Sequence, residues 1–193
     1  MTAPRLLLLD NFDSFTFMLA DGLRVAGAEV TVERNDALDV DRAIEGRCGI
    51  VISPGPGGPA EAGISVALAQ DCLRRGVPLL GVCLGHQALA LACGGTVGRV
   101  APMHGKIAEV RHDGSGLFAG LASPMSATRY HSLAATALPA CLVANAWSED
   151  GVVMAMRHSS APAHGIQFHP ESVATPFGNA LLAAFVEQCR ENA

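Results

Sequence analysis

A cysteine stands between two glycines in the segment Gly81-Val82-Cys83-Leu84-Gly85, after an aliphatic run and before a helical pattern. A nucleophile at a sharp strand-to-helix turn needs small residues on both sides, because the strained backbone brings its neighbours close. The positive end of the following helix favours the thiolate over the thiol at Cys83. A buried cysteine packed between glycines would explain the pentapeptide alone. The strand–turn–helix context instead favours Cys83 as a nucleophile.

A thiolate nucleophile needs a base, and the base needs a group that orients it. The segment His169-Pro170-Glu171 follows a strand predicted over Gly165–Phe168. Residues two apart in extended chain point to the same face, so the Glu171 carboxylate can hold the His169 ring. A His-x-Glu at a strand end is by itself usually a solvated turn. Beside a nucleophilic cysteine on the same sheet, it predicts a base and its orienting carboxylate.

A stiff loop, Ser53-Pro54-Gly55-Pro56-Gly57-Gly58-Pro59, follows another aliphatic run. Proline cannot donate a hydrogen bond, so the loop between its outer prolines has backbone N–H groups only at its three glycines. These could present fixed donors to a developing oxyanion, with the N–H of Leu84 as the natural second donor. A tight connection without a catalytic role is an equal alternative from composition alone.

The other histidines and cysteines show no metal-ligand spacing. No H-x-x-x-H lies on a helix, and the six cysteines contain no C-x-x-C pair. This pattern argues against a structural zinc site and against a disulfide framework. We therefore expect no metal and no cofactor.

The elements that must position these residues alternate in the first half of the chain. Aliphatic runs at Arg5–Leu9, Gly49–Ser53 and Val77–Val82 predict strands, as does the valine-containing segment Glu29–Glu33. Helical patterns lie between and after them, including one over Leu84–Cys93. Such alternation predicts right-handed crossovers and a parallel sheet with helices on its faces. The second half has short strand-like segments that could extend this sheet or form an antiparallel layer beside it. A final helix carries apolar residues between Phe177 and Cys189 on one side. We expect one α/β domain over residues 1–193.

Composition excludes several classes of function. The chain has 193 residues, a net charge of −5 and a single lysine, Lys106, so it lacks the basic face that nucleic acid or an anionic membrane requires. Its longest apolar run, Ala180–Val186, is far too short to cross a bilayer. The run Leu6–Leu9 is too short for a signal peptide. We expect a cytoplasmic protein.

Taken together, these motifs resemble the class I, or triad-type, glutamine amidotransferases, and most closely the small subunits of anthranilate synthase and aminodeoxychorismate synthase. The resemblance runs nearly end to end. It rests on Asp10–Thr16, Ser53–Gly57, Gly81–Gln87, His104–Lys106, Arg129–Leu133 and Gly165–Ser172. It implies an α/β fold with a mostly parallel open sheet flanked by helices, flavodoxin-like, with a small additional antiparallel β layer.

The resemblance also implies a reaction and its residues. Cys83 would attack the side-chain amide of L-glutamine to form a glutamyl thioester and release ammonia. His169 would act as base and then as acid, with Glu171 orienting it. The matching positions for the oxyanion donors are Gly57 and Leu84, and those that hold glutamine are Gly55, Gln87, Ser132 and Leu133. Ammonia would pass to a larger chorismate-binding synthase subunit, with His104-Gly105-Lys106 and the carboxyl ends of the strands as candidate contact surfaces.

Three questions stay open at this level. The segments Arg34–Leu38 and Ala62–Ser65 slightly favour the aminodeoxychorismate (folate) branch over the anthranilate (tryptophan) branch, and one subunit can serve both. A stand-alone γ-glutamyl or DJ-1-like cysteine hydrolase on the same fold is one alternative. A catalytically silent regulatory subunit is another, against which the complete set of Cys83, His169 and Glu171 argues.

Overall fold

A computed structural model describes residues 2–103 and 105–191, and the predicted contact residue His104 lies outside them. Its first half contains β1 (Arg5–Asp10), α1 (Thr16–Val25), β2 (Glu29–Arg34), α2 (Val40–Ile44), β3 (Gly49–Ile52), the 3₁₀ turn η1 (Pro59–Glu61), α3 (Ser65–Arg75), β4 (Leu79–Val82) and α4 (Leu84–Ala92). The second half contains β5 (Thr96–Arg99), β6 (Lys106–His112), the 3₁₀ turn η2 (Gly116–Phe118), β7 (Met125–Arg129), β8 (Leu133–Ala137), β9 (Leu142–Ser148), β10 (Val153–His158), β11 (Ala163–Ile166) and α5 (Gly178–Glu191).

A nine-stranded open sheet forms the centre, in the order β2-β1-β3-β4-β11-β10-β9-β6-β7. The strands from β2 to β11 in this order are parallel, and those beyond β11 join by antiparallel pairs. The predicted fold class is confirmed. The strand-like segments of the second half extend the main sheet. The small antiparallel layer is built instead by β5 and β8, which the sequence did not indicate.

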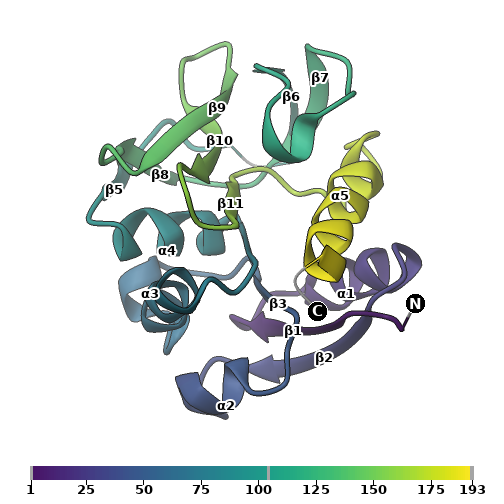
Figure 1. Cartoon of the computed structure of the whole chain (residues 1–193). Coiled ribbons are helices and arrows are strands. Elements are labelled where there is room, and N and C mark those ends of the chain that lie inside the picture. The colour runs from purple at the N-terminus through teal and green to yellow at the C-terminus, as the bar shows by residue number, and fades with distance from the viewer. Residues whose placement is uncertain (1, 104, 192–193) are drawn as a thin grey trace.

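Helices cover both faces of the parallel part, and strand β1 shows how the core divides. Leu6 and Leu8 pack toward α1 and α5, whereas Leu7 and Leu9 pack toward α3 and α4, so alternate side chains of one strand enter two different hydrophobic layers. Figure 1 shows α1 beside α5 on one side and α3 beside α4 on the other. All four leucines are fully buried, as expected for a parallel strand covered on both faces. Nowhere in the described chain is a helix long and apolar enough to span a bilayer.

Strand order also positions the candidate site. Strand β4 ends at Val82, directly before Cys83, and its neighbour β11 runs parallel to it. The carboxyl ends of the two strands therefore lie side by side. This brings the segment after β11 next to the cysteine, although the two are far apart in sequence.

Candidate active site

Cys83 occupies the sharp turn between β4 and α4. Its backbone has φ 52° and ψ −100°, a conformation that residues with a side chain rarely adopt, and its N–H donates to the carbonyl of Ile166 at 2.8 Å. A Cβ atom on Gly81 would overlap the carbonyl of Gly85, and one on Gly85 would overlap the carbonyl of Ile52. Both glycines are thus required by close backbone approach, the reason the sequence suggested for them.

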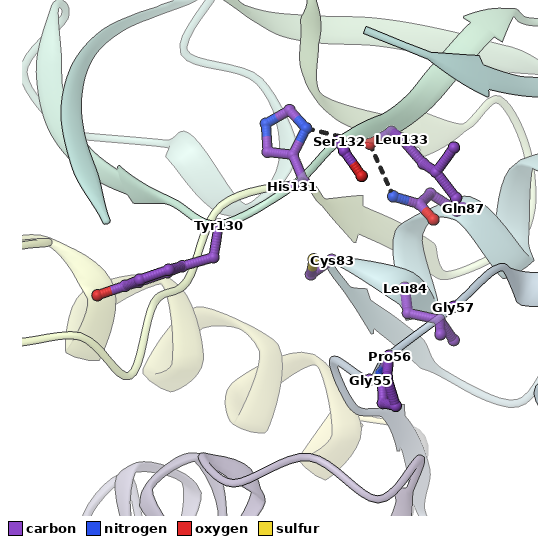
Figure 2. A pocket seen from close by; sticks show the side chains of 10 residues that line it. All are labelled: Gly55, Pro56, Gly57, Cys83, Leu84, Gln87, Tyr130, His131, Ser132 and Leu133. Carbon is purple, nitrogen blue, oxygen red and sulfur yellow. Dashed lines mark hydrogen bonds between the residues drawn. The ribbon is translucent and has the colours of Figure 1, made fainter. Parts of the chain in front are cut away.

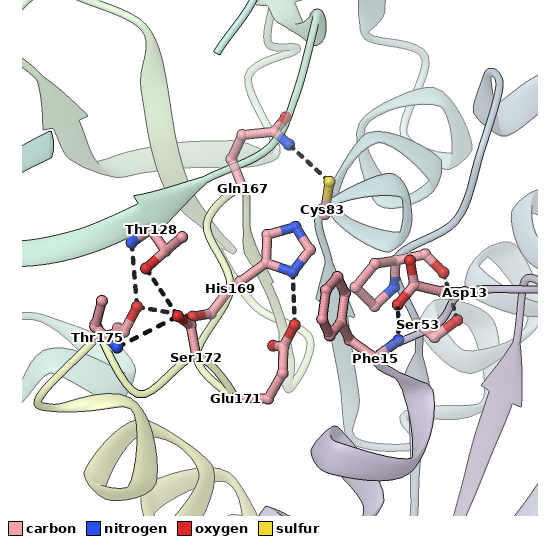
Figure 3. A network of polar contacts seen from close by, with 12 residues as sticks. Asp13, Phe15, Ser53, Cys83, Thr128, Gln167, His169, Glu171, Ser172 and Thr175 are labelled. Carbon is pink, nitrogen blue, oxygen red and sulfur yellow. Dashed lines mark hydrogen bonds and ion pairs between the residues drawn. The ribbon is translucent and has the colours of Figure 1, made fainter. Parts of the chain in front are cut away.

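His169 and Glu171 form a buried pair next to this cysteine. The Nδ1 atom of His169 lies 2.5 Å from the Glu171 carboxylate, and Figure 3 shows the ring between Glu171 and Cys83. Burial by itself lowers the pKa of His169, but the Cys83 sulfur and Glu171 outweigh it and raise that pKa to about 10. The Nε2 atom of His169 is buried and makes no hydrogen bond of normal geometry. The arrangement places an imidazolium beside the sulfur of Cys83.

The backbone that carries this pair differs from the extended segment we expected. Strand β11 ends at Ile166, and His169 and Glu171 lie in the irregular chain and turn that follow, so their contact comes from a turn and not from strand alternation. The turn is held by β7: the N–H of His169 donates to the carbonyl of Thr128 at 3.1 Å. The hydroxyl of Thr175 donates to the carbonyl of His169 at 2.8 Å (Figure 3).

A cavity of about 160 Å³ opens beside the sulfur of Cys83. The structure places all six predicted glutamine-binding and oxyanion residues on its wall. Figure 2 shows the full lining: Gly55, Pro56, Gly57, Cys83, Leu84, Gln87, Tyr130, His131, Ser132 and Leu133. His169 and Glu171 border a second cavity, of about 200 Å³, and Tyr130 lines both. Cys83 thus lines one cavity and the His169–Glu171 pair lines the other, with Tyr130 between the two cavities.

A buried polar network holds the glycine-rich loop that follows β3. Asn11 donates from its side chain to the carbonyl of Ser53 at 3.1 Å and from its backbone N–H to the Ser53 hydroxyl at 2.9 Å. Its own side-chain oxygen accepts from Asn35 and from Ser65, each at 2.8 Å. Asn35 and Ser65 belong to the segments that we used to favour one synthase branch. In the structure they support the loop.

Three residues of the site escaped sequence reasoning. The buried Gln167 donates from its side-chain amide to the sulfur of Cys83 at 3.5 Å. The rings of Phe15 and Tyr130 stack on each other with centroids 6.1 Å apart and meet His169 edge-on. Gln167 after a strand and the exposed Tyr130 carry no periodic signal, and the helical spacing of Phe15 predicted only a helix. Only their place in the motifs Asp10–Thr16, Arg129–Leu133 and Gly165–Ser172 marked them.

One group of described residues has side chains of the kind that hold metals. Ligand atoms of Cys93, Cys141 and His158 lie within 4.8 Å of one another, a proximity that their wide spacing in the sequence does not indicate. The Nδ1 atom of His158 already accepts the backbone N–H groups of Ser160 and Ala161. The neutral ring then carries its proton on Nε2 and offers no free lone pair. Two thiols alone are fewer than the three protein ligands usual for zinc.

A strained cysteine at a strand-to-helix turn, next to a histidine–carboxylate pair on an open α/β sheet, defines the class of enzymes that cleave amides or esters through a thioester. Residues 7–189 match the model of the family described as "Glutamine amidotransferase class-I". The chain therefore belongs to the class I glutamine amidotransferases, as its motifs predicted, and it is an enzyme.

Two curated proteins and one solved structure illustrate the relationship. Anthranilate synthase component 2 of Azospirillum brasilense is 49% identical over 189 residues, covering 96% of each chain. Aminodeoxychorismate synthase component 2 of Escherichia coli (strain K12) is also 49% identical over 189 residues, covering 95% of this chain and all of the relative. The structure of a glutamine amidotransferase from Thermotoga maritima superposes with a TM-score of 0.84 over 99% of this chain. At 18% identity it shows the fold alone.

Proposed function

We propose that this chain is a single-domain glutaminase subunit that hydrolyses L-glutamine through a Cys83 thioester and delivers the ammonia to a chorismate-using synthase subunit. The observation that carries the proposal is the convergence of Cys83, His169 and Glu171 beside a cavity lined by all the predicted glutamine-binding residues. The two component 2 relatives support the partner class.

The proposed reaction uses these residues in the following steps. The Cys83 thiolate attacks the side-chain carbonyl carbon of glutamine, and N–H groups of Gly57 and Leu84 receive the oxyanion. The His169 imidazolium gives its proton to the leaving nitrogen, and ammonia departs as the thioester forms. His169, now neutral, takes a proton from water, which attacks the thioester and frees glutamate. Glu171 keeps the ring oriented and stabilises its charge throughout.

Replacing the nucleophile tests this assignment in the assembled complex. We expect Cys83→Ala to abolish glutamine-dependent amination of chorismate while ammonia-dependent amination continues, because the synthase no longer receives ammonia but still accepts it from solution. Both rates are measured on the complex with each candidate synthase, and the aminated product is identified. Glutamine-dependent turnover at the wild-type rate would overturn the proposal.

The proposal covers both synthase branches, because the reported relatives of the two kinds are equally similar to this chain. Anthranilate as the product places the chain in one branch, aminodeoxychorismate in the other, and both products make it a shared subunit. The alternative of a stand-alone γ-glutamyl or DJ-1-like hydrolase has no specific observation in its favour.

The synthase contact surface is proposed beside the second cavity. Exposed apolar side chains gather there around His169 and Glu171: Phe15, Met18, Tyr130 and Val173, the last with 96% of its surface exposed. Apolar surface next to a catalytic pair is best covered by the subunit that receives the product. Two residues of the earlier candidate are described: Gly105 lies near the ring of Tyr130 at the edge of this surface, and Lys106 begins β6.

A charge placed in this surface tests it. We expect Val173→Arg to prevent co-purification with the synthase, because a guanidinium there would have to be desolvated in the interface. The matched control is Val25→Arg, since Val25 is 81% exposed at the end of α1 and lies outside the second cavity. Equal binding by both variants would place the contact surface elsewhere.

A further inference from the structure

An arginine is buried beside the site without touching the cavity. Arg129 closes strand β7 with only 2% of its surface exposed, and its guanidinium donates to the two carboxylate oxygens of Asp150 at 3.1 and 3.4 Å. Asp150 is itself partly exposed. Burying a charged group is unfavourable unless it is paired, so this placement indicates that the guanidinium is needed where it lies.

The arginine fixes the proton of its neighbour. Guanidinium nitrogens only donate, so the Nε2 atom of His131, 3.1 Å from Nε of Arg129, must accept. The proton of the neutral ring then sits on Nδ1 and is donated to the carbonyl of Leu133 at 3.0 Å. Burial and, after it, the charge of Arg129 lower the pKa of His131 to about 4. His131 is therefore a neutral ring of one tautomer at neutral pH.

The carbonyl of Leu133 receives a second donor from the other side. Gln87 donates to it at 2.9 Å, and Figure 2 shows both hydrogen bonds meeting at this oxygen. The same amide nitrogen of Gln87 lies 3.1 Å from the side-chain oxygen of Gln167, whose own amide donates to the sulfur of Cys83. The hydrogen bonds thus form one continuous path from the surface carboxylate to the nucleophile.

Two more carbonyls of the segment between β7 and β8 accept hydrogen bonds from the chain that leads from β5 to β6. The N–H of Met103 donates to the carbonyl of His131 at 2.9 Å, and the N–H of Val100 donates to that of Ser132 at 3.0 Å. The irregular segment between β7 and β8 therefore has a fixed backbone, although it forms no regular structure of its own.

We propose that Arg129, His131 and Asp150 are positioning residues that fix the cavity wall at Ser132 and Leu133 and thereby set the affinity for glutamine. The inference rests on the proposed function, because it takes this cavity to be the glutamine site. None of the three residues reacts. His131 itself lines the cavity, Arg129 and Asp150 stand behind it, and together they hold Ser132 and Leu133 in place for the substrate.

Substitutions at His131 test the inference in the complex with the synthase. We expect His131→Leu to raise the KM for glutamine about tenfold, the size that loss of one buried hydrogen bond produces, with a smaller change in kcat. His131→Asn can still donate to the carbonyl of Leu133, so it should recover most of the affinity. Ammonia-dependent turnover should be the same in both variants, which shows that the complex is intact.

A surface variant keeps the test decisive if His131→Leu does not fold. Asp150→Asn removes the charge that balances Arg129, and we expect a severalfold higher KM for glutamine. Glu149→Gln is the matched control: it makes the same change of charge at the adjacent exposed residue, which has no hydrogen bond or ion pair in the described chain. Its KM should equal that of the wild type.

The outcomes distinguish the positioning role of these residues from the proposed function of the chain. A wild-type KM in both His131→Leu and Asp150→Asn overturns the positioning role and leaves the proposed function intact. A loss of thermal stability without a KM-specific effect, or without rescue by His131→Asn, also overturns it. If the wild-type complex uses ammonia but not glutamine, the proposed function fails, and this inference fails with it.

Discussion

At Cys83 the chain holds a backbone conformation that costs about 1–3 kcal/mol for a residue with a side chain. The surrounding structure enforces it through the two neighbouring glycines and through the hydrogen bond to Ile166. The conformation presents the sulfur at the start of a helix, next to the imidazolium of His169. The backbone strain, the helix dipole and the His169–Glu171 pair all act at Cys83. Single substitutions around this residue should therefore change the catalytic rate more than their size suggests.

Removing the charge of Glu171 tests the ion pair. We expect Glu171→Gln to lower the pKa of His169 from about 10 and to reduce glutamine-dependent kcat about 100-fold, with little change in KM. At a pH between the old and new pKa values, the variant ring loses the proton that the wild-type ring keeps. Imidazole NMR across the pH range measures the shift. A ring that titrates as in the wild type would contradict the role of Glu171.

At the scale of elements, the loop after β3 depends on residues from three other segments. Asn11 follows β1, Asn35 follows β2, and Ser65 begins α3, and they converge on the loop through hydrogen bonds with buried partners. The loop can therefore present Gly57 with a positive φ of 75° in a stable position. Its proposed oxyanion role relies on this support from outside the loop.

Deleting one hydroxyl measures that support. We expect Ser65→Ala to lower the free energy of unfolding by about 1–2 kcal/mol, because the buried oxygen of Asn11 loses a donor. The kcat/KM for glutamine should fall severalfold as the loop loosens. Urea unfolding provides the first measurement, with Ser126→Ala as the control because Ser126 is exposed on β7. Equal losses in both variants would refute the support role.

The elements also show what the sequence could and could not predict. Strands β1, β3 and β4 were predictable because buried parallel strands are continuous aliphatic runs, and the edge strand β2 because its valines alternate with polar residues. Strands β5 and β8 were missed, since Thr96–Arg99 is short and polar and Leu133–Ala137 is mostly alanine and threonine. The motifs located Cys83, His169 and Glu171. A buried Arg129 could not be expected, because arginine in a sequence normally indicates solvent and only the tertiary structure supplies its partners.

At the scale of the whole molecule, the structure buries three neutral histidines. Burial is the largest cause that lowers the pKa values of His86, His131 and His164, each to about 4. In the unfolded chain these rings titrate near 6.5. Between these values the unfolded state binds more protons than the folded state, so stability is full above about pH 6.5 and is lost as the pH falls toward 4.

Acid unfolding measures this linkage. Each histidine contributes up to about 1.4 kcal/mol per pH unit to the slope of unfolding free energy between these limits. We expect His164→Gln, which lies outside the site, to give a shallower slope than the wild type in urea titrations at a series of pH values. A slope equal to that of the wild type would show that His164 titrates normally in the folded protein.

The pairing of β4 with β11 has a consequence for the protein while it is being made. The ribosome delivers Cys83 long before it delivers Gln167, His169 and Glu171, and strand β11, which pairs with β4, is made only just before them. A nascent chain that ends between Cys83 and strand β11 carries the cysteine but neither the base nor the strand whose Ile166 carbonyl holds the cysteine backbone. Translation order therefore leaves the incomplete polypeptide without an assembled active site.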